Sequence, residues 1–266
     1  MKYSIGEVSS LLNLSREMIR YYEKQGAIKA SRNAENNYRS YDSMEVFWLL
    51  EAIQHKSWGI PISGITDIRA NHFARNIREY LEERIAVLES REAYLSLLAD
   101  RLKQVKSYAA LGQVNIGNFW VTEMPAVWRC HLVTGRGDDY DRITLKKEES
   151  AFIFSDERLP FFDSGLMVRE HGVDWEMSIE EHYLTSLGDT PPGSFVRSPA
   201  SMALCTHLDI GEIGDFHPEI FQVLPDYAAS HGYTVPHDAQ MQGFLLGRGY
   251  EDGRFRRLVR MYLPVV

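Results

Sequence analysis

The strongest constraint on the fold is a long stretch without a helix breaker, from Phe73 to Leu111. It contains neither glycine nor proline and is rich in Glu, Arg, Leu and Ala, which favour helix. At a rise of about 1.5 Å per residue, one continuous helix here is about 55 Å long. Its apolar residues follow the 4–3 spacing of a coiled-coil seam, interrupted at Glu92. The seam consists of Leu81, Ile85, Leu88, Leu95, Ala99 and Leu102.

Such a helix needs a partner to cover its single narrow stripe. The partner is either the C-terminal part of the same chain or the same helix of a second copy. Residues 112–117 hold glycines at both ends, and we interpret them as a linker that ends the helix. The sequence therefore divides into residues 1–72, the helix 73–111, the linker 112–117 and residues 118–266.

Residues 3–41 are predicted to form a helix–turn–helix followed by a short β-wing. Ser15 suits the N-cap of a second helix and Gly26 suits its end. Asn36 and Asn37 are a hairpin-turn signal. The inward side chains are expected to be Ile5, Val8 and Leu12 on the first helix and Met18, Ile19 and Tyr22 on the second.

Two further helices should complete this region. Asp42 and Glu45 have the spacing of a capping box, which opens a helix to about Lys56. Pro61 suits the first turn of a short helix, Ile62–Arg69. The apolar residues expected to pack on the first two helices are Val46, Phe47, Leu49, Leu50 and Ile53.

The basic residues of this region suit a DNA reader. Arg16, Arg20 and Lys24 recur along one face of the second helix. A helix of this size fits the major groove, where arginine pairs with guanine. Arginine and tyrosine side chains beside it can bind phosphate. The alternative is a small helical domain whose basic residues are merely solvated.

Three stretches resemble the N-terminal domain of the MerR family of transcriptional regulators. They read I-R-Y-Y-E-K-Q-G-A-I at residues 19–28, N-Y-R-S-Y at 37–41 and H-K-S-W-G-I-P-I-S-G-I at 55–65. The sequence departs from the family pattern at Ala27 and at Ala30-Ser31. The resemblance runs from the start of the chain to about Ala70. It implies an antiparallel dimer through residues 73–111 and DNA contacts from Ser15, Arg16, Arg20, Tyr21, Tyr22, Tyr38, Arg39 and Lys56.

Composition and cysteines narrow the function classes. No run approaches the roughly 18 apolar residues of a membrane span, and the N-terminus does not resemble a secretion signal. Cys130 and Cys205 form no metal or disulfide pattern, so we expect a cytoplasmic protein without a metal site. Residues 118–266 carry 13 Lys and Arg against 23 Asp and Glu, a net charge of −10. This part should point away from DNA phosphates.

The C-terminal part is predicted to contain strand–helix–strand–strand twice. W-R-C-H-L-V-T-G, which ends at Gly135, is similar to A-L-C-T-H-L-D-I-G, which ends at Gly211, if one insertion is allowed. W-E-M-S-I at 175–179 is similar to V-R-M-Y-L at 259–263. The expected strands are 119–133, 165–170, 175–183, 202–210, 240–249 and 256–264, and the expected helices are 144–157 and 217–231. This doubling suggests two similar halves with a groove between them.

The order of these elements and the ending Y-L-P-V at 262–265 resemble the GyrI-like effector-binding domain. The overall fold class is then α+β and multidomain. In that family the groove takes small molecules, often aromatic or cationic, and a glutamate near the chain end meets the cation. Here Arg260 or Met261 stands at that place, and Glu176 is the repeat equivalent of Arg260. The candidate ligand-binding residues are Trp120, Phe154, Trp175, Glu176, Tyr183, Phe244, Arg260 and Tyr262.

The two resemblances imply a homodimeric transcriptional regulator rather than an enzyme. It would bind a pseudo-palindromic promoter operator, bind a small organic effector without any cofactor, and distort the DNA so that RNA polymerase engages the promoter. Two alternatives stay open. One is a GyrI-like hydrolase that uses Glu176, Glu180 or Glu181 with Tyr183 or Tyr262 as an acid/base pair. The other is a DNA-binding regulator that responds to no ligand.

Overall fold

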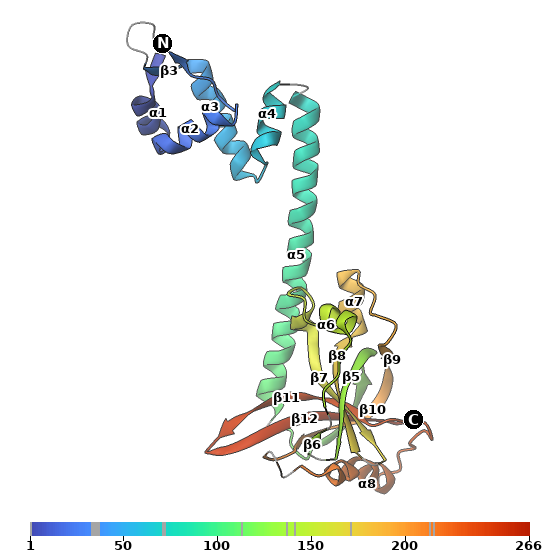
Figure 1. Cartoon of the computed structure of the whole chain (residues 1–266). Helices are drawn as coiled ribbons and strands as arrows, with labels where there is room; N and C mark the ends of the chain where they lie inside the picture. The colour runs from blue at the N-terminus through green and yellow to red at the C-terminus, as the bar shows by residue number, and fades with distance from the viewer. Residues whose placement is uncertain are drawn as a thin grey trace. The chain divides into compact units, whose positions relative to one another are not determined.

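The computed structural model describes residues 2–32, 38–70, 73–112, 114–136, 138–140, 142–170, 172–212, 214 and 216–266. Two compact units make up the chain, Met1–Ala93 and Tyr94–Val266 (Figure 1). Each has a hydrophobic core. Helix α5 (Phe73–Gly112) contributes its first part to one unit and its last part to the other. The proposed turn at Asn36 and Asn37 lies outside the described residues.

The N-terminal unit begins with the predicted helix–turn–helix. In α1 (Ile5–Leu12) the Ser4 hydroxyl accepts the Glu7 N–H at 3.2 Å, and the Glu7 carboxylate accepts the Ser4 N–H at 2.7 Å. This capping box was not predicted. Helix α2 (Arg16–Lys24) starts at Ser15, whose hydroxyl accepts the Met18 N–H at 3.1 Å. Gly26 follows at φ 81°, a conformation that favours glycine.

The wing belongs to a three-stranded antiparallel sheet with the order β1-β3-β2. Its strands are β1 (Lys2–Ser4), β2 (Ser31–Arg32) and β3 (Arg39–Asp42). Strand β1, which was not predicted, pairs with β3 and ties the chain start to the wing.

Helices α3 (Ser43–Ser57) and α4 (Ile62–Ala70) close this core. Val46 and Leu49 are buried as predicted, but Phe47 and Leu50 are 61% and 46% exposed. Their prediction is wrong because α3 buries only the stripe through Val46, Leu49 and Ala52, and the described residues of this unit do not cover the next face of the helix. Met18 was also expected inside and is 45% exposed.

Glu45 forms half of the expected capping box. Its backbone N–H donates to the Asp42 carboxylate at 2.9 Å. Its own carboxylate instead accepts the Lys29 N–H and pairs with Arg69, both at 2.7 Å. Arg69 also donates to the Ala27 carbonyl. Ala27 is buried, so this departure from the family pattern lies at a point where α4 is fastened to the loop after α2.

The C-terminal unit is built on one large antiparallel sheet with the order β4-β10-β12-β11-β7-β8-β5-β6, where β9 also pairs with β5. Short helices and 3₁₀ turns lie between the strands. The strands are β4 (Phe119–Met124), β5 (Val127–Arg136), β6 (Asp139–Tyr140), β7 (Phe162–Arg169), β8 (Gly172–Glu180), β9 (Val196–Ser198), β10 (Ser201–Asp209), β11 (Gln242–Glu251) and β12 (Arg254–Pro264); the helices are α6 (Lys147–Ile153), α7 (Glu181–Leu187) and α8 (Val223–Ser230), and the 3₁₀ turns are Leu159–Phe161 and Pro218–Gln222.

Three predicted elements have different bounds. The single strand expected at 119–133 breaks between β4 and β5, where Pro125 removes a backbone donor. The helix expected at 144–157 is limited to α6. The strand expected at 175–183 ends at Glu180, and the next residues begin α7. Tyr183 therefore lies on a helix rather than on a strand.

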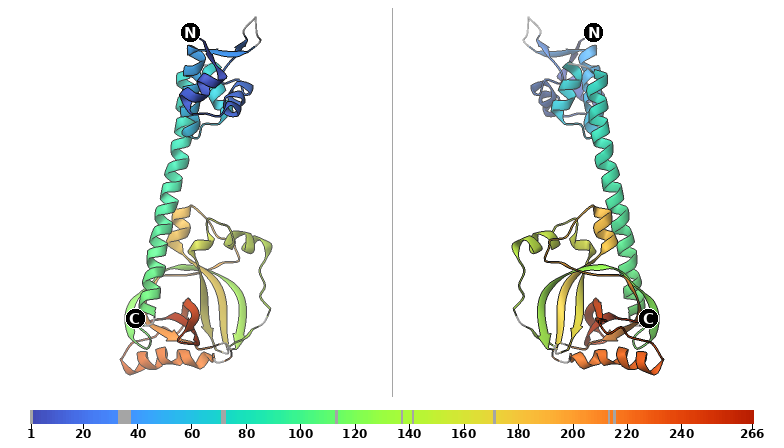
Figure 2. Two further views of the ribbon diagram at one scale, coloured as in Figure 1. Left: turned by 90° about the vertical axis from the view of Figure 1, so that its left-hand side faces the viewer. Right: turned by 90° about the vertical axis from the view of Figure 1, so that its right-hand side faces the viewer.

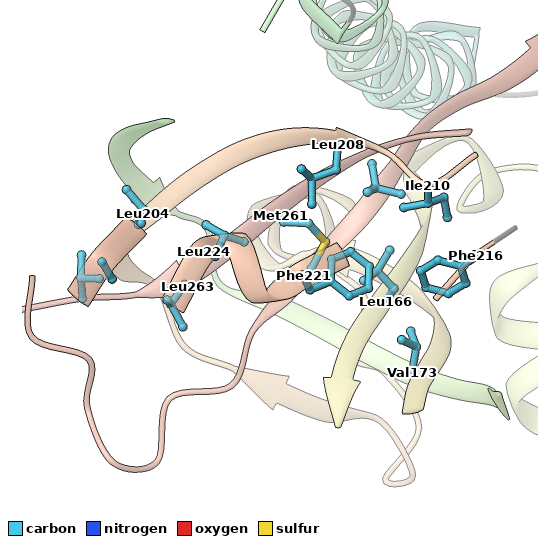
Figure 3. Packing of buried hydrophobic residues seen from close by; sticks show 13 residues of the cluster. Leu166, Val173, Leu204, Leu208, Ile210, Phe216, Phe221, Leu224, Met261 and Leu263 are labelled. Atoms are coloured by element: carbon cyan, nitrogen blue, oxygen red, sulfur yellow. The ribbon is translucent and has the colours of Figure 1, made fainter. Parts of the chain in front are cut away.

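The two faces of the sheet pack against different helices (Figure 2). Val259, Met261 and Leu263 of β12 point into a core that α8 closes with Leu224 (Figure 3). The alternate residues of β12 lie on the other face. There the end of α5 packs, with the Tyr108 ring 5.3 Å from that of Phe244.

Helix α5 uses one side within the C-terminal unit and leaves the predicted seam exposed, except at Leu81, which packs on the N-terminal core. Tyr94, Leu97 and Leu98 pack against a buried cluster around Phe161 and Tyr183. On the other side, the exposed fractions are 52% for Ile85, 49% for Leu88, 51% for Leu95 and 60% for Leu102. The helix therefore contacts its own C-terminal unit, but not through the seam.

Candidate DNA-binding surface and effector site

Helix α2 presents a basic face to solvent. Arg16 and Arg20 are exposed and one helical turn apart, and Tyr21 is 42% exposed. Ser15 sits at the N-cap, so its hydroxyl is held by the Met18 N–H. Three of these side chains are free of the core and can meet a ligand on the outer face of the helix.

Tyr22 does not belong to this exposed face. Its side chain is 5% exposed and packs in the core with Val8, Ile19 and Tyr41. The expectation that Tyr22 contacts DNA is wrong for this structure, because the helical period places it opposite Arg20.

The wing adds two exposed side chains. Tyr38 is 74% exposed, and Arg39 on β3 is paired with Glu23 of α2 at 3.3 Å. Tyr41 donates its hydroxyl to the same carboxylate at 3.0 Å. Burial and this carboxylate raise the pKa of Tyr41 to about 12. Glu23 thus fastens the wing to α2.

Lys56 is exposed in the last turn of α3. Beneath it, the buried His55 ring lies 5.3 Å from the Trp58 ring, and burial lowers the His55 pKa. A neutral His55 leaves Lys56 as the positive charge at this helix end.

In the C-terminal unit, a small cavity of about 30 Å³ lies on the α5 face of the sheet. Two candidate ligand residues, Phe244 and Tyr262, line it. The other side chains around it are mostly polar or small, including Arg129, Asp163, Glu180 and Gln242.

Arg260 lies on the same strand face as Tyr262, enclosed by aromatic rings. Its guanidinium carbon is 5.2 Å from the centre of the Tyr262 ring, 5.3 Å from that of Tyr108 and 5.6 Å from that of Trp120. Its cross-strand neighbour is the buried His207. Burial and the guanidinium both lower the pKa of His207, so the imidazole is neutral beside Arg260.

Glu176 occupies the matching place on β8 and has a different environment. It is 5% exposed, and its carboxylate accepts from Arg129 at 3.2 Å. Burial raises the Glu176 pKa more than Arg129 lowers it. Glu176 and Arg260 belong to one cross-sheet row, joined through Gly165 and Phe244.

Three candidate residues lie elsewhere. Phe154 is 52% exposed at the end of α6. Trp175 packs against the core closed by α8, on the opposite face of the sheet. Tyr183 is buried, and its hydroxyl donates to Gln104 at 3.1 Å. The structure thus brings Trp120, Phe244, Arg260 and Tyr262 together, and separates Phe154 and Trp175 from them.

The end of α5 supplies polar and aromatic residues that the sequence analysis assigned only to a coiled coil. Arg101 pairs with Asp163 at 2.5 Å, and Gln104 donates to Glu180 at 3.0 Å. Tyr108 stacks near Phe244 and Arg260. A second stripe at helical spacing, opposite the seam, was the available signal for them.

Metal ligands are not grouped in the part of the chain that the structure describes, where no three His, Cys, Asp or Glu side chains could hold an ion. Both cysteines are buried, and burial raises each thiol pKa to about 11. None of the described helices is long and apolar enough to span a bilayer.

Comparisons with known proteins bear mainly on the N-terminal part. The family model "MerR family regulatory protein" matches residues 4–41. The multidrug-efflux transporter 1 regulator of Bacillus subtilis (strain 168) is 31% identical over 119 residues, which are 42% of this chain and 43% of that protein. The heavy metal-dependent transcription regulator 2 of Rhizobium meliloti (strain 1021) is 27% identical over 110 residues, 40% of this chain and 75% of that protein.

The match thus spans less than half the length of the Bacillus relative. Among solved structures, the EcmrR–DNA complex studied by cryo-electron microscopy aligns over 99% of both chains at 15% identity, with a TM-score of 0.34. A TM-score this low supports no conclusion about the fold or function of this chain.

Proposed function

We propose that this chain, whose residues 4–41 match the MerR family model, is a MerR-type transcription regulator that binds promoter DNA as a homodimer and responds to a small organic effector. The observation that carries this proposal is the exposed basic face of α2 beside the wing, on residues matched by the family model. Such a helix fits the major groove, and the wing fits the flanking backbone.

Each side chain of this surface has a proposed role. Arg16 and Arg20 read base edges, because exposed arginines on a recognition helix can pair with guanine. Tyr21, Tyr38, Arg39 and Lys56 bind phosphate and fix the register. Ser15 holds the start of α2 in place.

A second copy of the chain is the proposed partner for the α5 seam. Ile85, Leu88, Leu95 and Leu102 are about half exposed, while the opposite side of α5 already packs on the C-terminal unit. The seam spacing fits helix–helix packing. An antiparallel pair of α5 helices covers these leucines and supplies two DNA-binding domains for a pseudo-palindromic operator.

The C-terminal unit is proposed to be a GyrI-like effector domain made of two related halves. The sheet order β10-β12-β11-β7-β8-β5 reads as one half followed by its reverse. The cross-strand pairs His131–Glu176 and His207–Arg260 hold equivalent places in the two halves, and their residues lie in the two pairs of similar sequence stretches. Trp120, Phe244, Arg260 and Tyr262 form the effector site near the junction.

Helix α5 links the two activities in this proposal. Arg101, Gln104 and Tyr108 contact the effector site, and the same helix begins in the DNA-binding unit. An effector that changes the contacts of α5 shifts the regulator toward a state that distorts the promoter and lets RNA polymerase engage it.

Selection of bound sequences from random duplex DNA tests the proposal. The full-length protein should enrich a pseudo-palindromic site at low micromolar concentration or below. Arg16→Ala should relax the preference at one or two base pairs in each half-site, worth about 1–3 kcal/mol of discrimination. Recovery of no preferred sequence by the wild type would refute the DNA-reading role.

The hydrolase alternative rests on three glutamates, of which Glu176 is paired with Arg129 and Glu181 with Arg197 at 2.5 Å. The third, Glu180, lines the small cavity together with Tyr262, where its carboxylate accepts a hydrogen bond from Gln104. Burial raises the pKa of Tyr183 and of Tyr262, which makes both phenols harder to ionise for a role as base. A regulator without a ligand response is separated from our proposal by transcription assays with and without an effector.

A further inference from the structure

Arg260 differs from the other shielded arginines of the C-terminal unit. Among its described residues, six arginines are buried or half-buried. Five have a carboxylate partner: Arg101 with Asp163, Arg129 with Glu176, Arg158 with Asp189, Arg256 with Asp209 and Arg257 with Asp138. For Arg260 the described residues offer no carboxylate within ion-pair distance, and its Nε has no hydrogen-bond partner.

The surroundings of Arg260 leave its charge uncompensated. The guanidinium carbon lies over the rings of Tyr108, Trp120 and Tyr262. The neighbouring His207 is neutral, and burial raises the pKa of the Cys205 thiol, which is hydrogen-bonded to Arg260 but carries no negative charge. Cation–π contacts are worth about 0.5–2 kcal/mol each. Removing an ion from water costs several kcal/mol. The half-buried guanidinium of Arg260 would therefore be stabilised by a hydrogen-bond acceptor that reaches its N–H groups.

Two rings near Arg260 line cavities: Tyr262 lines the small one described above, and Tyr108 lines a more open one. The open cavity has a volume of about 290 Å³ and is lined by Tyr108, Leu258, Arg248 and Arg256, with Glu251 as its acidic residue. Tyr108 belongs to both the cavity and the ring cage, and Leu258 is the next residue on the face that carries Arg260. Arg256 is neutralised by Glu251 and Asp209, which leaves Arg248 as the second arginine of the lining.

We propose that Arg260 is the anchor of an effector that carries a carboxylate, so the site takes small organic anions and excludes cations. This inference rests on the proposed effector role of the C-terminal unit. The surrounding rings offer no carboxylate and the Nε has no hydrogen-bond partner, so N–H donors of the planar guanidinium remain for a carboxylate. A cationic ligand is excluded because the aromatic cage already holds the protein's own cation. In the neighbouring cavity, Glu180 forms no ion pair with a described arginine, but Gln104 and His182 engage its carboxylate.

Benzoate and benzamidinium form a matched pair of probes, with one ring and a planar charged group of opposite sign. In calorimetric titrations of the full-length protein, benzoate should bind saturably at millimolar concentration and benzamidinium should not. Arg260→Gln should weaken benzoate binding at least about tenfold, the loss expected for a charge-assisted hydrogen-bonded contact. Arg158→Gln, which removes a paired arginine elsewhere in the unit, should leave it unchanged.

The unliganded protein gives an independent readout. Arg260→Met should raise the Tm of the C-terminal unit by about 2–4 °C, because it removes a buried charge without a partner. Arg158→Met should lower the Tm, because it leaves Asp189 unpaired. A fall in Tm for both variants, preferential binding of benzamidinium, absence of saturable benzoate binding, or full benzoate affinity in Arg260→Gln would each overturn the proposal.

DNA binding separates this result from the wider function. Arg260→Gln should keep the wild-type affinity for the selected operator. If the wild type binds benzoate but no DNA, the regulator role fails while the anion site stands. If it binds the operator but not benzoate, the anion site fails and the DNA-reading role is unaffected.

Discussion

The two units of this protein use their charges in opposite ways. In the N-terminal unit Arg16, Arg20 and Lys56 are exposed and available to a polyanion. In the C-terminal unit, charges such as Arg101, Arg129 and Arg257 are buried and each faces a carboxylate. The cations of the first unit are therefore available to a ligand, whereas the other buried or half-buried arginines described in the second unit are neutralised by a nearby carboxylate. Arg260 is the arginine of that described set without such a partner.

The largest effect should come from substitutions in the apolar seam of α5. Leu88→Glu with Leu95→Glu should give monomers by light scattering and reduce operator affinity about 10³-fold or more, to the level of non-specific binding. Both leucines are about half exposed within one chain, so folding of the monomer should survive. Val87→Glu is the control, because Val87 is 50% exposed but lies outside the seam. A dimer in the double variant would show that the interface lies elsewhere.

A buried pair should be far more costly to break than an exposed one. Asp138 is buried and pairs with Arg257 while accepting the Gly214 N–H at 2.6 Å. Asp138→Asn should lower the unfolding free energy of the C-terminal unit by about 3–5 kcal/mol, because Arg257 loses its counter-charge. Glu79→Gln on α5, which breaks the exposed pair with Arg75, should cost about 0.5 kcal/mol or less. Similar denaturation midpoints for the two variants would contradict the claim that the buried pair stabilises the protein more than the exposed pair.

Low pH should weaken the same pair, Asp138 with Arg257. Hydrogen bonds from Arg257 and Gly214 hold the pKa of Asp138 well below its ordinary value, despite burial. A depressed folded pKa contributes stability that is present above the unfolded value of about 3.9 and is lost as pH falls below it. The Tm of the C-terminal unit should therefore fall steeply below about pH 4. In Asp138→Asn that part of the slope should disappear; an identical acid profile would argue against the pair as its origin.

The smallest effect concerns one exposed charge of the N-terminal unit. Arg39→Ala should weaken binding to all DNA sequences alike and reduce the slope of log affinity against log salt by about one unit. Arg75→Ala, an exposed arginine on α5, should change neither quantity. An unchanged salt slope for Arg39→Ala would remove Arg39 from the phosphate-binding surface.

The N-terminal unit could be predicted well because its determinants are local. Ser15 and Gly26 mark the ends of α2 within a few residues, and the period of α2 separates Ile19 from Arg16 and Arg20. The errors at Met18, Phe47 and Leu50 arose where an apolar residue was assigned to the core by type. The tertiary fold decides which side of a helix is covered by a neighbour, and the period of the sequence does not determine this.

The effector site could be predicted only in part because its contacts are distant in sequence. Arg260 and Tyr262 are alternate residues of the strand expected at 256–264, and the structure places both on one face of β12. Tyr108 and Gln104 were not predicted, because the coiled-coil seam already accounted for the apolar pattern of the helix on which they lie. Phe154 and Trp175 were chosen for their aromatic rings, but α6 ends in solvent and Trp175 points to the other face of the sheet.

The small size of the cavity beside Phe244 and Tyr262 has a kinetic consequence. A volume of about 30 Å³ is far below the roughly 300 Å³ or more that a drug-sized ligand fills, so larger ligands can enter only after the side chains that line the cavity move. Their observed association rate should then level off with rising concentration at the opening rate of the site. Their apparent affinity is reduced by the fraction of time the site is closed. In the proposed effector role, the speed of the response to such molecules would be set by a movement of the protein rather than by diffusion.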